Sequence, residues 1–382
     1  MLVRHLSLVD FRNYETADIA LSAGPNLFVG SNGQGKTNLV ESLGYLSTLS
    51  SHRVSTEHAM IRQGMASAIV RARLEHDGRE RLVEVQLNRG AANRAQVNRS
   101  PIKVRELPRY FSSVLFAPED LVLVRGDPSS RRRFLDELLV LRSPRMSGVT
   151  ADYDRVLKQR NTLLKSARAA GVKGGGLSTL EVWDDRLVTL GSEIIAARTA
   201  LVDELRPEVA SAYISVAGED HRATLATQLS IVSDPDATEP LSPAETAPSP
   251  ADIAEAFRTA LARVRRSELD RGVTLVGPHR DDVVFGLNGM AAKGYASHGE
   301  SWSFALAIKL ASAQVLRRES TSGDPVLILD DVFAELDQSR RARLSLAVAG
   351  FEQVLITAAV FDDVPEEMTR TTVRIVQGKI VE

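Results

Sequence analysis

The stretch of sequence that decides the fold is residues 30–37, which read Gly30-Ser31-Asn32-Gly33-Gln34-Gly35-Lys36-Thr37. The apolar run Leu27-Phe28-Val29 precedes it, and apolar residues at helical spacing follow it. A G-x4-G-K-[ST] pattern between a strand and a helix is typical of a phosphate-binding loop. Its glycines let backbone N–H groups point at a phosphate chain, and the helix adds its positive end. We therefore predict a nucleotide site in which Lys36 contacts the β- and γ-phosphates and Thr37 ligates Mg²⁺.

The other half of a nucleotide site is an acidic residue at the end of a buried strand. Residues 326–331 read Val326-Leu327-Ile328-Leu329-Asp330-Asp331. Four apolar residues in a row are typical of a strand covered on both faces, as in a parallel sheet. Asp330 then lies at the carboxyl end of the strand, where open α/β sheets bind ligands, and is the predicted second Mg²⁺ ligand. Asp331 is expected to orient or deprotonate the attacking water; the alternative is that it only caps a turn.

A third candidate segment is Ser297-His298-Gly299-Glu300, which lies just before a predicted helix over 301–318. The S-x-x-E spacing is that of a capping box, which would explain both residues structurally. The functional alternative is an anion site, in which the Ser297 hydroxyl and the Gly299 amide meet a γ-phosphate at the start of the helix. Its position shortly before the strand that ends in Asp330 favours the functional alternative.

Helix and strand patterns divide the chain into two predicted parts. Strand-like runs alternate with helices near both ends, which predicts an α/β fold. Residues 129–168 and 179–216 are strong helix formers separated by a glycine-rich run, which predicts a helical hairpin. A further strand is expected at 273–276. We predict a head formed by 1–125 and 271–382, an inserted helical arm over 126–270, and a flexible acidic, Pro/Ala-rich loop at about 233–252.

Composition narrows the possible classes of protein. The chain has 382 residues, of which 43% are hydrophobic and 25% charged, so it is an ordinary globular sequence. Its formal net charge is −2, so any affinity for nucleic acid must come from local patches. The sequence has no cysteine, which excludes thiol catalysis and disulfides. We see no signal peptide or membrane span and expect a cytoplasmic, nucleoid-associated protein without a membrane partner.

Taken together, these motifs resemble the ABC-type ATPase heads of the SMC-like branch, which works in DNA repair and chromosome maintenance. The resemblance extends over both ends of the chain. It also rests on four further segments, Asp10–Tyr14, Phe116–Asp120, Gly277–Asp282 and Leu329–Asp337. It implies an ABC-type (SMC-like) P-loop ATPase head with an inserted helical arm, and the cofactors ATP and Mg²⁺.

The resemblance also implies roles for individual residues. Ser297, Gly299 and Glu300 match the signature segment, which in such heads acts on ATP held by a second copy. Asp337 matches the loop that couples the two sites, although it could equally cap the helix that follows. Arg12 and Asn13 match a segment that approaches the nucleotide; the alternative is a surface turn.

Two departures from transporter-type heads concern hydrolysis. Asp331 stands where those heads have a glutamate, and Thr357-Ala358-Ala359 contains no histidine where they have a switch histidine. With Lys36, Asp330 and Asp331 as the catalytic residues, these differences predict slow hydrolysis.

Two arginine-rich segments are candidates for contact with DNA phosphates. One is a basic strand region and the other is an arginine triplet at a helix start, for which pairs at i,i+4 with Asp136 and Glu137 are a sufficient structural explanation. The candidate residues are Arg71, Arg73, Arg79, Arg81, Arg131, Arg132 and Arg133. Such contacts would be sensitive to salt and tolerant of sequence.

The resemblance implies an ATP-dependent DNA-binding protein of recombinational repair and replication restart, with weak DNA-dependent ATPase activity. ATP would close a homodimer on single-stranded, duplex, gapped or junction DNA. Expected partners are recombination mediator proteins of the same pathway. The resemblance also implies that this protein helps recombinase loading and SOS induction. The alternatives are an SMC-like chromosome-maintenance ATPase, which needs much longer coiled coils, an ABC-head nuclease, which needs a further metal domain, and a transporter subunit, which needs a membrane partner.

Overall fold

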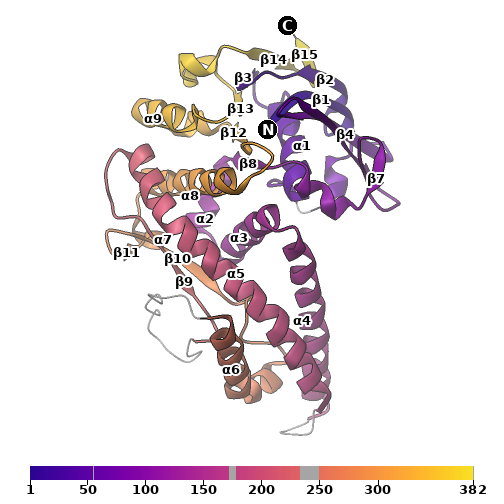
Figure 1. Cartoon of the computed structure of the whole chain (residues 1–382), viewed down its shortest axis with the longest axis vertical. Coiled ribbons are helices and arrows are strands. Elements are labelled where there is room, and N and C mark those ends of the chain that lie inside the picture. The colour runs from indigo at the N-terminus through magenta and orange to yellow at the C-terminus, as the bar shows by residue number, and fades with distance from the viewer. Residues whose placement is uncertain (55, 172–177, 233–248, 382) are drawn as a thin grey trace. The chain divides into compact units, whose positions relative to one another are not determined.

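The computed structural model describes residues 1–54, 56–171, 178–232 and 249–381. The chain forms two compact units. The head unit comprises Met1–Leu121, Glu208–His221 and Ser297–Glu382, so the indigo and yellow ends of the chain belong to the same unit (Figure 1). The helical unit comprises Val122–Pro207 and Arg222–Ala296. These boundaries differ from the predicted ones in three places: residues 122–125 and 271–296 fall in the helical unit, and residues 208–221 fall in the head unit.

A six-stranded sheet in the order β15-β14-β3-β13-β12-β8 carries the nucleotide motifs of the head unit. Neighbouring strands run parallel except for the β14–β15 hairpin. All five residues of β12 are buried, as its apolar sequence predicts. The strands are β3 (Gly24–Val29), β8 (Ser113–Phe116), β12 (Val326–Asp330), β13 (Gln353–Ala358), β14 (Thr372–Val376) and β15 (Lys379–Val381).

A second six-stranded sheet of the head unit is antiparallel, in the order β2-β1-β4-β5-β6-β7. Its buried face packs into one hydrophobic core with α1 and with residues of the parallel sheet. Its strands are β1 (Leu2–Phe11), β2 (Tyr14–Ala20), β4 (Ser67–His76), β5 (Arg79–Asn88), β6 (Arg94–Val97) and β7 (Ser100–Ile102). The predicted α/β fold is therefore confirmed.

The principal helices of the head unit begin within or directly after the sequence motifs. The principal ones are α1 (Lys36–Thr48), α8 (His298–Glu319) and α9 (Gln338–Val348). Short 3-10 turns are η1 (Glu57–Met60), η2 (Val104–Arg109), η3 (Pro118–Asp120), η4 (Val332–Glu335), η5 (Phe361–Asp363) and η6 (Glu366–Met368). None of the helices in the described part of the chain combines the length and apolar character needed to cross a bilayer.

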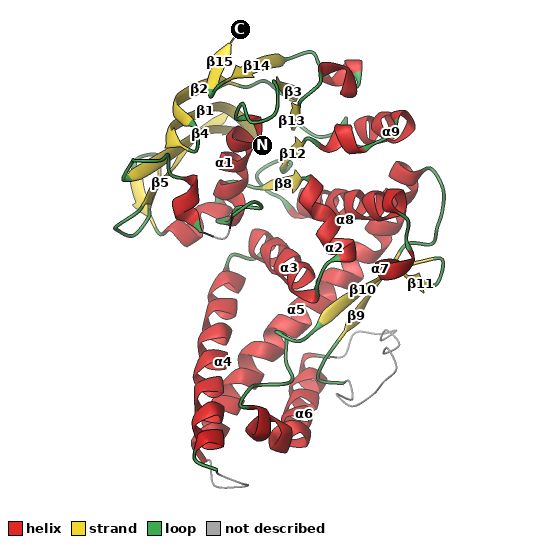
Figure 2. Ribbon diagram, turned by 180° about the vertical axis from the view of Figure 1, so that it is seen from behind, coloured by secondary structure: helices red, strands yellow, loops and turns green. Residues whose placement is uncertain are grey.

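The helical unit contains the predicted hairpin, with one difference (Figure 2). Its helices are α2 (Leu121–Arg125), α3 (Pro128–Arg142), α4 (Arg145–Ala169), α5 (Ser178–Ala217), α6 (Pro250–Arg271) and α7 (Ala292–Tyr295); α2 starts at the last residue of the head unit, and α5 ends in it. The helix predicted over 129–168 is in fact α3 and α4. Ser143 between them is extended, because a residue before proline disfavours the helical conformation.

The predicted strand at 273–276 is wrong. Two backbone amides of this segment bond to side chains instead of to a neighbouring strand: Thr274 N–H donates to Asn161 Oδ1 and Leu275 N–H to Glu268 Oε1. The small sheet of this unit is β11-β10-β9 instead, with β9 (Thr224–Gln228), β10 (Asp282–Leu287) and β11 (Met290–Ala291).

The predicted acidic loop lies largely outside the described residues, as do residues 172–176 of the predicted hairpin tip. Of the loop, residues 249–252 are described, and they start α6. Ser249 caps this helix by accepting a hydrogen bond from the Asp252 amide.

Candidate nucleotide site

The glycines of the phosphate loop are required by close approaches of neighbouring chain segments. A Cβ at Gly30 would lie 2.3 Å from the carbonyl oxygen of Ile375 in β14. Gly35 has a φ of +117°, and a Cβ there would come within 3.0 Å of the side chains of Asn13 and Tyr14. A side chain at either position would therefore displace the loop.

Contacts from two other segments and one contact within the loop hold the loop in place. The Gln34 carbonyl accepts hydrogen bonds from Asn13 Nδ2 at 3.1 Å and from the Gly378 amide at 2.9 Å. The side chain of Lys36 is buried, and its Nζ donates to the carbonyl of Ser31 at 3.3 Å. Ser31, Asn32 and Gly33 are exposed at the tip of the loop. This leaves the tip free to meet a phosphate chain.

The two predicted metal ligands meet across 293 residues of sequence. Thr37 Oγ1 donates to Asp330 Oδ1 at 3.0 Å, and Thr357 Oγ1 donates to the same oxygen at 2.6 Å. Asp330 ends β12, and Thr357 lies beside it on β13. The parallel register of β12 and β13 thus brings Asp330 to the phosphate loop.

Asp331 follows in a left-handed conformation with a φ of +51°. Its amide donates to Thr357 Oγ1 at 2.9 Å, but its carboxylate makes no cap hydrogen bond to η4. Its Oδ1 is buried and has no hydrogen-bond partner among the described residues. Burial raises the pKa of this carboxyl, Lys36 opposes the rise, and Asp330 adds to it. The geometry therefore favours a ligand-facing Asp331 over the capping alternative.

The oxygen atoms of these side chains suit a Mg²⁺ ion that takes only a few of its ligands from the protein. Mg²⁺ is held through one or two oxygen side chains together with phosphates and water. Thr37 offers a hydroxyl oxygen and Asp330 a carboxylate oxygen as ligands. The orphaned Oδ1 of Asp331 is a further acceptor for the water that such an ion carries.

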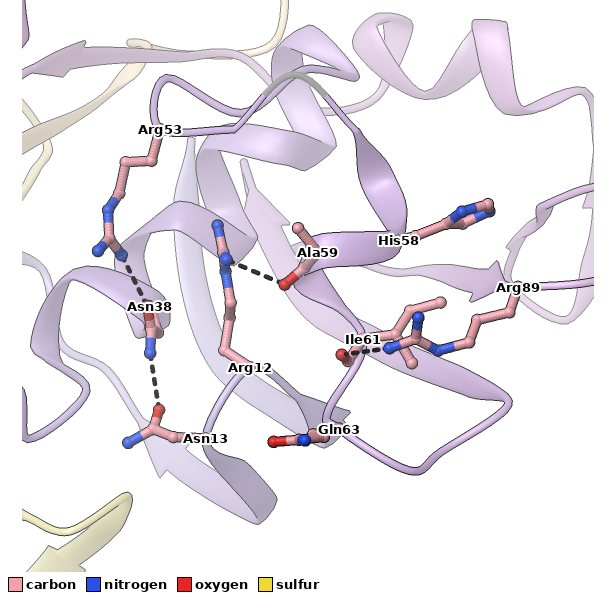
Figure 3. Close-up of a pocket in the computed structure, with 9 residues that line it drawn as sticks. All are labelled: Arg12, Asn13, Asn38, Arg53, His58, Ala59, Ile61, Gln63 and Arg89. Carbon is pink, nitrogen blue, oxygen red and sulfur yellow. Dashed lines mark hydrogen bonds between the residues drawn. The ribbon is translucent and has the colours of Figure 1, made fainter.

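A basic cavity of about 560 Å³ lies beside the phosphate loop (Figure 3). Arg12, whose φ is +56°, pairs through its guanidinium with buried Glu41 at 2.6 Å and donates to the Ala59 carbonyl. Asn13 accepts from Asn38 at 2.8 Å. Asn13 thus joins the cavity wall to the phosphate loop, which supports the predicted approach of this segment to the nucleotide over a surface turn. The residues that line the cavity are Arg12, Asn13, Asn38, Arg53, His58, Ala59, Ile61, Gln63 and Arg89.

The predicted signature turn forms a capping box at the start of α8. Ser297 Oγ accepts from the Glu300 amide at 3.3 Å, and Glu300 accepts from the Ser297 amide at 2.7 Å. No hydrogen bond or ion pair within the described ranges joins residues 297–300 to residues 30–37. Since the Ser297 hydroxyl is exposed and still has its own proton to donate, the cap does not exclude a role toward a second copy.

Asp337 caps α9 and positions an arginine beside the signature turn. Its Oδ1 accepts from the Arg340 amide at 2.9 Å, and its Oδ2 pairs with the Arg340 guanidinium at 2.8 Å. That guanidinium lies against Gly299, where an added Cβ would be 3.0 Å away. The capping alternative for Asp337 is therefore realised, and it links the two predicted segments within one chain.

Two of the three arginines of the triplet, Arg131 and Arg132, make contacts within the protein. Arg131 is buried, and its guanidinium pairs with Asp282 at 2.7 Å. This corrects the prediction for Arg131, because its guanidinium has no surface for a DNA phosphate. Arg132 is half-buried and donates to the Asp281 carbonyl at 2.7 Å, whereas Arg133 is exposed. Asp136, the expected partner of Arg132, instead pairs with Arg198.

The four arginines of the strand region do not share one face. Arg71 and Arg73 alternate with buried residues and so lie on the outer face of the sheet, and Arg71 pairs with Glu84. Arg79 and Arg81 are paired in register with His76 and Leu74, on the other face at the end of the β4–β5 hairpin. Arg81 lies 5.3 Å from the ring centre of Tyr110. Of the two candidate arginines on the outer face, Arg73 is the exposed one.

Sequence reasoning missed residues that the structure adds to the site. His52 lies 3.7 Å from Asp330, and Arg53 and Arg89 line the cavity. No motif marks any of them. The one available signal was the dipeptide His52-Arg53 directly after the helix that follows the phosphate loop.

Comparison with known proteins agrees with this geometry. The RecF/RecN/SMC N terminal domain family matches residues 2–380. The "DNA replication and repair protein RecF" of Clavibacter sepedonicus is 66% identical over 388 residues, covering 100% of this chain and 95% of that protein. The protein of the same name from Leifsonia xyli subsp. xyli is 66% identical over 386 residues and is covered completely. The predicted SMC-like family is thus confirmed, and within it the sequence segments quoted above point to RecF.

Solved structures agree as well. A structure described as "the recombination mediator protein RecF-ATPrS in RecFOR pathway" has a TM-score of 0.87 and 27% identity, covering 99% of this chain and 97% of that one. A RecF-ATP structure from the same pathway gives the same score and identity. An SMC head gives a TM-score of 0.54 at 14% identity, a likeness of fold alone.

Proposed function

This chain belongs to the RecF family of ABC-type ATPases in DNA replication and repair, and we propose that it acts as an ATP-driven clamp on DNA. The observation that carries the proposal is the contact between Thr37 and Asp330 at 3.0 Å. It supports one half of a nucleotide site within one chain, while Ser297 of the signature turn is exposed and, among the described residues, the turn makes no hydrogen bond or ion pair to residues 30–37. At each of the two sites of a dimer, one copy would then contribute the phosphate loop and the other copy the signature turn.

In this proposal, the phosphate loop and Lys36 hold the triphosphate, and the cavity beside Arg12 and Asn13 receives the nucleoside end. Thr37 and Asp330 hold Mg²⁺. When bound, the ion neutralises charge that develops on the phosphate oxygens. Asp331 accepts a proton from the water that attacks the γ-phosphorus, giving ADP and phosphate. Its buried Oδ1, which has no hydrogen-bond partner among the described residues, suits a base, although its short side chain favours slow turnover.

Ser297, Gly299 and Glu300 are proposed to act on the partner copy's nucleotide. The Ser297 hydroxyl and the first amides of α8 would approach the γ-phosphate at the positive end of this helix. Asp337 would transmit the state of one site to the other through its contact with Arg340, which lies on Gly299. ATP would thus close the homodimer, and hydrolysis would open it.

DNA contact is proposed through exposed cations, chiefly Arg73, Arg79, Arg81 and Arg133. The half-buried Arg71 and Arg132 are secondary candidates, because Glu84 and the Asp281 carbonyl already bind them. Binding is expected to be salt-sensitive and independent of sequence. We propose that the clamp acts on gapped or junction DNA in the cytoplasm with the mediator proteins of its pathway, and that the head unit carries the nucleotide sites while the helical unit forms the arm.

Size-exclusion chromatography with ATP or a non-hydrolysable analogue, with and without DNA, tests the proposal. Wild type is expected to dimerise with nucleotide. Ser297→Arg is expected to bind nucleotide and stay monomeric, because the bulky cation blocks the contact across the dimer. Lys36→Ala is expected to lose both nucleotide binding and dimerisation. Dimerisation of Ser297→Arg equal to wild type would refute the contact.

A further inference from the structure

The carboxylate of Asp330 has one oxygen in use and one that faces a histidine. Oδ1 accepts from both Thr37 and Thr357. Oδ2 lies 3.7 Å from Nε2 of His52. This distance is too long for a hydrogen bond, although the two atoms face each other at the centre of the nucleotide site.

His52 has a polar atom that needs a partner. Its side chain is 15% exposed, and Nε2 is buried without a hydrogen-bond partner among the described residues. A buried polar atom without a partner costs about 1–3 kcal/mol. Oδ1 of Asp331, the residue after Asp330, is in the same condition. Two orphaned atoms beside the metal ligands indicate a site built for a bound species.

The fold holds His52 in this position from both sides. After α1 the chain turns at Leu49, which has a φ of +55°. Ser51 Oγ bonds to buried Glu41 of α1 and accepts from the amides of Arg53 and Val54 at 3.0 and 3.2 Å. The turn that carries the imidazole is therefore anchored to the helix that begins in the phosphate loop.

We propose that His52 is a positioning residue of the nucleotide site, whose Nε2 binds an oxygen of the Mg²⁺–triphosphate bound at Asp330. This proposal rests on the proposed nucleotide site. The sequence contains no histidine at Thr357-Ala358-Ala359. His52 would supply an imidazole to the site from a different element, the turn after α1.

The test compares three substitutions that separate the polar atom from the packing of the ring. His52→Ala removes both, His52→Phe keeps an aromatic ring without the polar atom, and His52→Gln keeps a hydrogen-bonding group. The affinity of a fluorescent ATP analogue is measured in Mg²⁺ and in EDTA, together with the melting temperature. His5→Ala, which alters a histidine 39% exposed on β1, is the matched control.

We expect His52→Ala and His52→Phe to weaken binding about tenfold in Mg²⁺, the size of one hydrogen bond, and to leave binding in EDTA unchanged. His52→Gln should recover part of the loss, and His5→Ala should match wild type. Wild-type affinity of His52→Phe in Mg²⁺, or equal losses in Mg²⁺ and EDTA, would overturn the role of His52. If Lys36→Ala also bound the analogue like wild type, the proposed nucleotide site itself would be wrong.

Discussion

Two buried polar clusters, one in each unit, differ in how completely their atoms are bonded. In the helical unit, Arg160 has no exposed surface and donates to Asp184, Thr274 and Glu268 at 2.7, 2.7 and 2.6 Å. We call this group the Arg160 cluster. In the head unit, by contrast, Asp331 Oδ1 and His52 Nε2 of the nucleotide site have no hydrogen-bond partner in the part of the chain that the structure describes.

The contrast separates a cluster that holds structure from one that awaits a ligand. A buried charge is tolerated when hydrogen bonds satisfy it, and the Arg160 guanidinium meets this condition. Unpartnered buried atoms instead call for an explanation such as an ion, water or substrate. We therefore expect changes in the Arg160 cluster to alter stability, and changes in the nucleotide site to alter binding and hydrolysis.

The largest expected effect is on the Arg160 cluster. Arg160→Ala leaves the buried Glu268 and the half-buried Asp184 without this partner and should lower the unfolding free energy by about 3–5 kcal/mol in urea titrations. Arg155→Ala, which removes an arginine 71% exposed on the same helix, should cost less than about 0.5 kcal/mol. Similar losses of unfolding free energy for the two variants would contradict a stabilising role of the Arg160 cluster.

The next effect is on the nucleotide site. Asp331→Asn should lower the rate of ATP hydrolysis about 100-fold, because it removes the proposed base. Nucleotide affinity and melting temperature should remain near wild type, since the Asp331 carboxylate makes no cap hydrogen bond. Glu335→Gln, at an exposed position of η4, is the control for phosphate release. An Asp331→Asn variant that hydrolyses ATP like wild type would contradict the assignment.

A smaller effect comes from the buried Asp281 and the half-buried His279 of the helical unit, whose pKa values are shifted in opposite directions. Burial raises the pKa of Asp281 to about 6 from 3.8, and burial lowers the pKa of His279 to about 4 from 6.5. The Asp281 carboxyl binds its proton more tightly in the folded state, so its contribution to stability falls as pH rises from about 4 to about 6. His279 does the reverse: its contribution is lost as pH falls from 6.5 to about 4.

Asp281→Asn removes one of these opposing contributions. The variant should therefore lose about 1–3 kcal/mol more stability than wild type between pH 6 and pH 4, because the His279 contribution is no longer offset. Urea titrations at several pH values measure this difference. Parallel pH profiles for the variant and wild type would show that Asp281 is ionised in the fold.

How much of this arrangement the sequence predicts depends on how local each signal is. The phosphate loop, the buried strand ending in Asp330 and the capping box of Ser297 are written in adjacent residues, and the structure has each of them. The break between α3 and α4 was not predicted, although the local signal is present, since Pro144 follows Ser143.

Features that depend on distant partners could not be predicted. The apolar run at 273–276 looks like a strand, yet Asn161 and Glu268 take its amides. Arg131 looks like a surface cation, yet Asp282 holds it in the interior. His52 has no motif of its own, and only the folded chain brings it to Asp330. In each case the deciding contact comes from elsewhere in the chain.

The smallest expected effect is on DNA binding, where an exposed arginine is compared with an arginine that is already paired. Arg73→Ala should lower the slope of log affinity against log salt by about 1, because an exposed cation is lost. Arg71→Ala should change the slope less, since Arg71 is already paired with Glu84. Fluorescence anisotropy with gapped DNA over a range of salt concentrations measures both. Equal slopes for the two variants would mean that pairing on this face does not decide DNA contact.

The central claim is that one nucleotide is bound by two copies, and mixing two defective variants tests it most directly. Tagged Lys36→Ala lacks a working phosphate loop but keeps Ser297, and untagged Ser297→Arg has the opposite defect. We predict that neither variant dimerises alone with a non-hydrolysable ATP analogue, but that the tagged variant captures the untagged one when the analogue is present. Failure of the mixture to associate, when wild type does associate, would contradict a site shared between two copies.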